Sequence, residues 1–65
     1  MKCVVVTDFN AWDFENIKSA RAWFNKLVEY TKTHEDGAEF VELFKSSDFY
    51  DESGADTFPI ECYYD

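Results

Sequence analysis

The sequence predicts an α+β fold: one small domain over residues 1–65, with the element order β-α-β-β, in which one long helix packs on one face of a three-stranded sheet. Three observations lead to this prediction. A β-branched run lies near the N-terminus, apolar residues recur at helical spacing over 14–33, and two shorter apolar segments follow. Phe, Tyr and Trp make up 20% of the 65 residues, and these large side chains favour a folded chain despite its high charge.

The first strand is expected over 1–9, MKCVVVTDF, because Cys, Val and Thr have a strong preference for β structure. Apolar side chains fall on both faces of this strand, with Cys3 and Val5 on one face and Val4 and Val6 on the other. Strands of this kind are usually covered on both sides.

The helix is expected over 14–33, after a turn at 10–13. Asp13 is the candidate N-cap, and Trp12 and Ile17 have the spacing of a hydrophobic staple. Lys32 and His34 suit the C-terminal end of a helix, and Gly37 follows it.

The segment 39–46 fits two structures. Phe40, Leu43 and Phe44 suit a helix, whereas the short length and the preceding Gly37 favour a strand, which is the preferred interpretation. Residues 46–57 have the composition of a loop. The last strand is expected over 58–65, with Pro59 near its start. If this strand lies beside the first and runs opposite to it, the two cysteines, Cys3 and Cys62, come close together.

One helix covers only one face of such a sheet. Val4, Val6, Tyr63 and either Val41/Leu43 or Phe40/Phe44 would lie on the other face, and an exposed apolar patch usually marks an interface. We therefore expect a homodimer, or a larger assembly, that packs sheet to sheet.

Catalytic and metal-binding patterns are absent from the sequence. The single histidine, His34, sits at a helix end without a nucleophile motif, and the two cysteines have no zinc spacing. The acidic stretch 48–56 does not match the calcium-loop pattern. We expect no enzyme activity, no cofactor and no metal. Two cysteines are too few for a disulfide scaffold, no segment is long and apolar enough for a membrane span or a secretory signal, and we expect a cytoplasmic protein with two buried thiols.

Charge is divided unequally along the chain. Residues 34–65 hold ten carboxylates and one lysine, a net charge of −9, while residues 1–33 carry +1, which gives the overall −8. Such a field repels nucleic acid and attracts basic protein surfaces. Solubility alone would also select negative charge, but it is better served by interspersed signs.

These features predict a small acidic protein that binds, and thereby inhibits, a basic nucleic-acid-binding surface of a partner protein, with carboxylates in the place of phosphates. In size and charge alone, the chain is similar to the tiny DNA-mimic proteins of phages and mobile elements that block restriction enzymes, CRISPR effectors or polymerases. The alternative is a structural module that self-associates through the open sheet face. The expected partner-binding residues are acids with aromatic neighbours: Asp48, Phe49, Tyr50, Asp51, Glu52, Asp56, Glu61, Tyr63 and Asp65.

Overall fold

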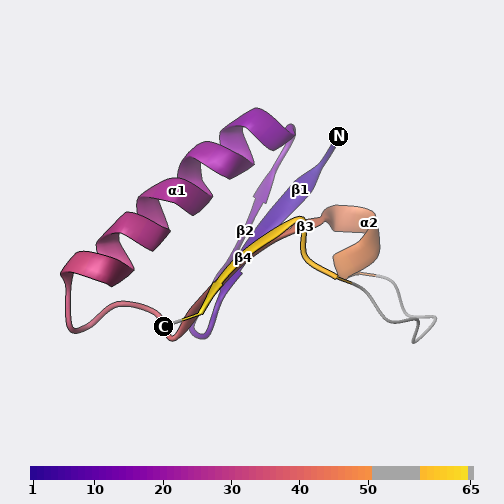
Figure 1. Cartoon of the computed structure of the whole chain (residues 1–65). Coiled ribbons are helices and arrows are strands. Elements are labelled where there is room, and N and C mark those ends of the chain that lie inside the picture. Colours follow the sequence, from indigo (N-terminus) through magenta and orange to yellow (C-terminus); the bar gives the residue numbers. More distant parts are fainter. Residues whose placement is uncertain (51–57, 65) are drawn as a thin grey trace.

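The computed structural model describes residues 1–50 and 58–64. Within them the chain forms one antiparallel sheet, in the strand order β2-β1-β3-β4, with a long helix on one side (Figure 1). The α+β class is confirmed. The elements in chain order are β1 (Cys3–Thr7), β2 (Ala11–Phe14), α1 (Ile17–Thr33), β3 (Phe40–Lys45), α2 (Ser46–Phe49) and β4 (Glu61–Tyr64).

The prediction of three strands is wrong, because the sheet has a fourth strand, β2, in part of the segment interpreted as a turn. The Thr7 N–H donates to the Asn10 carbonyl at 2.8 Å, and the buried Thr7 hydroxyl oxygen accepts the backbone N–H of Phe9 and of Asn10. This tight turn reverses the chain. Trp12 then lies opposite Val5 in an antiparallel pair. Trp12 is therefore a strand residue packed against the core, not a helix staple.

The helix begins at Ile17 instead of 14, and its N-cap is Asn16 instead of Asp13. The Asn16 side-chain oxygen accepts the Ser19 backbone N–H at 2.8 Å, which satisfies one of the free donors in the first turn. The end of α1 at Thr33 matches the expectation. After the helix, Gly37 packs directly against its last turn: a Cβ at this position would lie 2.6 Å from the Thr31 Cα.

The segment 39–46 contains a strand, β3, as preferred. It pairs antiparallel with β1, since the β1–β2 hairpin has already reversed the chain before α1 begins. β4 pairs antiparallel with β3 and not with β1. Cys3 and Cys62 are therefore separated by β3 and point to opposite faces. Cys3 is buried, whereas Cys62 is exposed, which corrects the expectation of two buried thiols.

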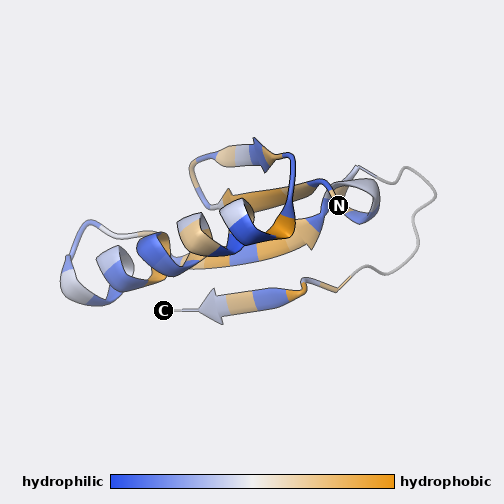
Figure 2. Cartoon of the chain, turned by 90° about the horizontal axis from the view of Figure 1, so that it is seen from above, coloured by the Kyte–Doolittle hydropathy of each residue, from blue (hydrophilic) through white to orange (hydrophobic). Residues whose placement is uncertain are grey.

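The core lies between α1 and the sheet. Figure 2 shows α1 above the central strands, with β2 and β4 to either side and the apolar colour concentrated on β1. The side chains that fill this layer come from β1, α1, β3 and the residue Ala38 shortly before β3: Cys3, Val5, Ala20, Phe24, Ala38, Val41 and Leu43. Every one of them is less than a tenth exposed, so the small domain has a continuous core. No helix among the described residues has the length and apolarity that crossing a bilayer requires.

Candidate binding surface on the open face of the sheet

The face of the sheet that points away from α1 is the candidate functional surface, and we call it the open face. Strand side chains alternate between the two faces, and the pairing registers align them across the sheet. This alternation places one set of strand side chains on the open face: Val4 and Val6 of β1, Ala11 and Asp13 of β2, Phe40, Glu42 and Phe44 of β3, and Cys62 and Tyr64 of β4.

One end of the open face is covered by α2, which lies on the side of the sheet opposite α1 (Figure 1). The rings of Phe44 and Phe49 pack with their centroids 5.6 Å apart, and Phe44 and Val4 are buried. The other end, which includes Val6 and Phe40, is only partly buried. The uncovered apolar area is therefore smaller than the sequence suggests.

Tyr50 follows α2 and reaches across this face to β2. Its hydroxyl donates a 3.0 Å hydrogen bond to Oδ1 of Asp13, from 37 residues further along the chain. The bond, together with the nearby negative charge of the Asp13 carboxylate, raises the pKa of Tyr50 above 10. Since Tyr50 is 57% exposed, the phenol and the carboxylate form a surface pair that is open to a partner.

A second pair of the same kind lies at the uncovered end. The Tyr64 hydroxyl donates a 2.8 Å hydrogen bond to Oε2 of Glu42 on the neighbouring strand. This bond, reinforced by the carboxylate charge, raises the pKa of Tyr64 to about 12. Tyr64 is 63% exposed. The open face thus presents two carboxylates, each held by an exposed tyrosine.

No lysine or arginine is among the strand side chains on the open face, so neither carboxylate there meets a cation from the strands. Asp13 and Glu42 lie two strands apart and two residues out of register. Standard sheet spacings put their Cα atoms about 12 Å apart. At that separation each carboxylate can accept its own lysine or arginine.

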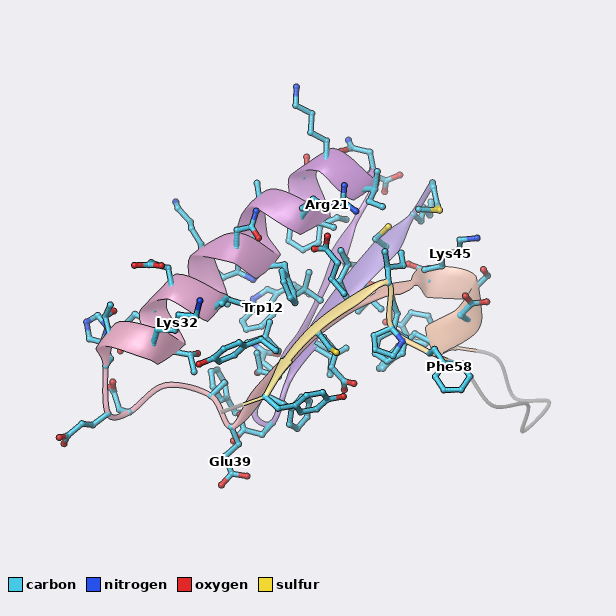
Figure 3. The ribbon with its side chains drawn as sticks, viewed as in Figure 1. Trp12, Arg21, Lys32, Glu39, Lys45 and Phe58 are labelled. Carbon is cyan, nitrogen blue, oxygen red and sulfur yellow. The ribbon has the colours of Figure 1, made fainter. Side chains whose placement is uncertain are left out.

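The cations of α1 lie on the other side of the sheet. Arg21 forms an ion pair with Glu61, with Nε 3.2 Å from Oε1, and the Lys32 ammonium lies 5.5 Å from the ring centroid of Tyr63. Figure 3 shows both cationic side chains on α1. Glu61 and Tyr63 were expected to bind a partner, but their alternation on β4 places them on the helix side, where Arg21 and Lys32 hold them.

The structure therefore places the expected site residues on both faces of the sheet, and some of them lie outside the described residues. Phe49 and Tyr50 lie against the open face, with Asp48 on the same helix, α2. Glu61 and Tyr63 lie on the helix side. Four of the expected residues, Asp51, Glu52, Asp56 and Asp65, fall outside the described residues.

Asp13 and Glu42 are the surface residues that the sequence reasoning missed. Asp13 was interpreted as a helix cap, although its alternation with Trp12 and Phe14 is the signal of a strand. Glu42 lies in a segment whose helical and extended interpretations both remained open. Only the strand assignment puts it on the face that α1 leaves uncovered.

A further polar cluster lies at the C-terminal end of α1. The rings of Tyr30 and His34 stack with centroids 3.9 Å apart, and the Tyr30 hydroxyl donates to Asp36 Oδ1 at 2.9 Å. The bond to the Asp36 carboxylate raises the pKa of Tyr30. The His34 Nδ1 lies within hydrogen-bond distance of the Thr33 hydroxyl and the Tyr30 carbonyl. These contacts give the polar groups at the C-terminal end of α1 hydrogen-bond partners within the chain.

Neither a ligand-sized pocket nor a group of metal-ligating side chains occurs in residues 1–50 and 58–64. Comparison of the chain with protein-family models, with curated proteins and with solved structures finds no match.

Proposed function

We propose that this chain is a small acidic binding protein whose open face docks on a cationic surface of a partner protein and keeps nucleic acid from that surface. The observation that carries the proposal is the pair of tyrosine-held carboxylates, Asp13 and Glu42, on a sheet face whose strands contribute no base.

Electrostatics supports a cationic partner. The net charge of −8 attracts positive surfaces over long range, and carboxylates accept charge-assisted hydrogen bonds from lysine and arginine, as phosphates do. The helix-side cations Arg21 and Lys32 already engage Glu61 and Tyr63, on the opposite side of the sheet. The two faces therefore differ in electrostatic character.

Aromatic side chains supply contact area on the same face. Tyr50 and Tyr64 are more than half exposed, and Phe49 at the end of α2 is 37% exposed. Tyrosine combines a large apolar ring with a polar tip and is common at the centre of protein interfaces. A hydrogen-bonded tyrosine also loses less side-chain freedom on binding, because its orientation is already set.

The partner expected from this chemistry is a nucleic-acid-binding protein, since its binding surface is rich in lysine and arginine that contact phosphates. In that proposal the acidic chain competes with nucleic acid for the same surface. A DNA-mimic inhibitor, of the kind that phages and mobile elements use against host defence systems, is the specific role we propose.

The test compares two double variants with the same net charge. Asp13→Asn with Glu42→Gln neutralises the open face without changing side-chain shape, and Glu29→Gln with Glu35→Gln does the same at exposed positions on α1 and just after it. Immobilised proteins are exposed to a cell lysate at low and high salt. Retained proteins are identified, purified and assayed for DNA or RNA binding.

The proposal expects a basic partner that is retained by wild type and by the Glu29/Glu35 variant, is lost from the Asp13/Glu42 variant, and is released by salt. The wild-type chain should also displace nucleic acid from that partner. Equal retention by the two variants, or retention that ignores salt, would remove the open face as the docking surface.

The alternative is self-association through the open face, which is favoured by the partly buried Val6 and Phe40 at its uncovered end. It expects dimers that do not require the two carboxylates. Sedimentation of wild type and of the Asp13/Glu42 variant distinguishes the functions, because neutralisation should strengthen contact between two anionic faces but weaken contact with a cationic one.

A further inference from the structure

β4 forms one edge of the sheet. In the part of the chain that the structure describes, it pairs with β3 alone, and the backbone groups on its other side have no sheet partner. Such an edge is a template for pairing with another chain. Edge pairing is also a recognised way for one protein to bind an extended segment of another.

We propose that the outer edge of β4 binds an extended, lysine- or arginine-rich segment of the partner as a fifth strand. This inference rests on the proposed function and states how the partner docks. Backbone hydrogen bonds would supply the pairing, and the side chains of β4 and its neighbours would select the charge of the incoming strand.

The charge beside β4 selects a cationic strand. Glu42, held by Tyr64, lies beside β4 on the open face, while Glu61 on the helix face is already paired with Arg21. Opposite charges on adjacent strands stabilise a pairing, while like charges destabilise it. A second copy of the chain would bring its own Glu42 and its net charge of −8 to the new pair, so a basic segment of another protein fits this edge better than a second copy.

β4 lacks two of the features with which proteins usually block an edge. Its residues, Glu61–Tyr64, include neither the lysine nor the proline typical of a protected edge, and Pro59 lies before the strand begins. Its short length limits spontaneous pairing. That limit makes the interaction depend on favourable charge as well as on the backbone.

Apolar side chains beside β4 remain available to an incoming strand. Tyr64 is 63% exposed, and Phe58 and Ile60, in the segment that leads into β4, are 81% and 38% exposed. Figure 3 shows the ring of Phe58 standing clear of the sheet.

The opposite edge strand, β2, offers less. Its two large side chains, Trp12 and Phe14, pack against the core, and its open-face side chains, Ala11 and Asp13, offer no exposed aromatic ring such as that of Tyr64. The β4 edge is therefore the better match for a strand that needs side-chain contacts as well as backbone pairing.

The test uses two synthetic peptides with alternating lysine and valine. One contains only L-residues, and the other has D-valine at each valine position. The two have the same charge and composition, but D-residues favour mirror-image backbone angles and prevent a regular strand. Binding at low salt is followed by NMR of the labelled protein, with affinities taken from the shifts of its backbone amides.

We expect the all-L peptide to bind about tenfold more tightly than its diastereomer, the gain from a small number of added backbone hydrogen bonds, with the largest shifts in β4. Cys62→Lys places a lysine on the edge and should abolish this preference. Asn25→Lys adds the same charge at an exposed position on α1 and should keep it. Thermal melts of both variants establish that the fold is intact.

Equal affinity of the two peptides, absence of binding by both, or largest shifts in β2 would overturn the inference. A different result would disprove the proposed function: equal retention of the partner by the Asp13/Glu42 variant and by the Glu29/Glu35 variant. Binding that depends on the open-face carboxylates but not on peptide chirality would thus leave the function standing and remove the added strand.

Discussion

The Tyr64 hydroxyl donates a 2.8 Å hydrogen bond to Oε2 of Glu42 and so joins β4 to β3 on the open face. The two residues are 22 positions apart in the sequence and become neighbours only through the β3–β4 register, in which Cys62 lies opposite Glu42. Tyr64 is the diagonal neighbour of Glu42, within reach of a long side chain.

This bond predicts a pH dependence. Because the pKa of Tyr64 is raised to about 12 from 10 in the unfolded chain, its contribution to stability is fully present below pH 10 and is lost as the pH rises through about 12. Glu42→Gln removes the carboxylate charge and should lower the pKa of Tyr64 towards 10. Phenolate absorbance, measured during alkaline titration of wild type and variant, checks the shift, and superimposable curves would contradict it.

The N-cap gives a stability prediction. Asn16→Ala removes the acceptor of the Ser19 N–H and should lower the free energy of unfolding by about 1 kcal/mol. Glu15→Ala, at the exposed neighbouring position, is the control and should change it much less. Urea denaturation measures both. A neutral effect of Asn16→Ala would mean that the cap lies elsewhere.

Gly37 predicts a steric effect. A Cβ at this position would lie 2.6 Å from the Thr31 Cα and 3.2 Å from the Thr31 carbonyl oxygen, and backbone atoms yield less readily than a flexible side chain. Gly37→Ala should therefore cost about 1–3 kcal/mol of stability, as other overpacked substitutions do. Asn25→Ala, on the exposed surface of α1, should be nearly neutral in the same denaturation experiment.

The cysteines predict a difference in reactivity. Cys62 is exposed and Cys3 is fully buried, so a thiol reagent should modify one group per native chain and the second only after unfolding. Sheet spacings put the two Cα atoms about 14 Å apart, beyond the reach of a disulfide. Mass spectrometry after brief labelling identifies the site. Rapid modification of both thiols, or an intramolecular disulfide, would contradict the β4 placement.

The sequence predicted those elements that have long or strongly patterned segments. The β-branched run gave β1, the recurrence of apolar residues gave α1 up to Thr33, and the shorter runs gave β3 and β4. These signals are local, because burial on one face of a helix or on a strand repeats at a fixed interval.

β2 was missed because its alternation extends over only four residues, and because Asp13 satisfies the local rule for a helix cap as well as Asn16 does. Pairing with β1 decides between these structures, and it depends on the turn at Thr7–Asn10. Once β2 is a strand, β3 must run antiparallel to β1. One local ambiguity thus decided the number of strands in the sheet.

The candidate surface was predicted only in part for the same reason. Phe49 and Tyr50 were recognised from their acidic neighbours. Asp13 and Glu42 acquire their role only through tyrosines 37 and 22 residues away, and no local pattern reports such a distance. The face that each β4 residue occupies also depends on where α1 lies.

The position of β4 has a consequence for partial unfolding. All the residues that are less than a tenth exposed among those described lie between Cys3 and Phe44, and β4 adds only the partly buried Tyr63 to that layer. An edge strand with so little buried surface should open more readily than the central strands, and its amide hydrogens should exchange with solvent sooner than those of β1 and β3. A partner bound at β4 would raise the free energy of this opening. Amide exchange in β4 would then respond more strongly to a bound partner than exchange in any other strand.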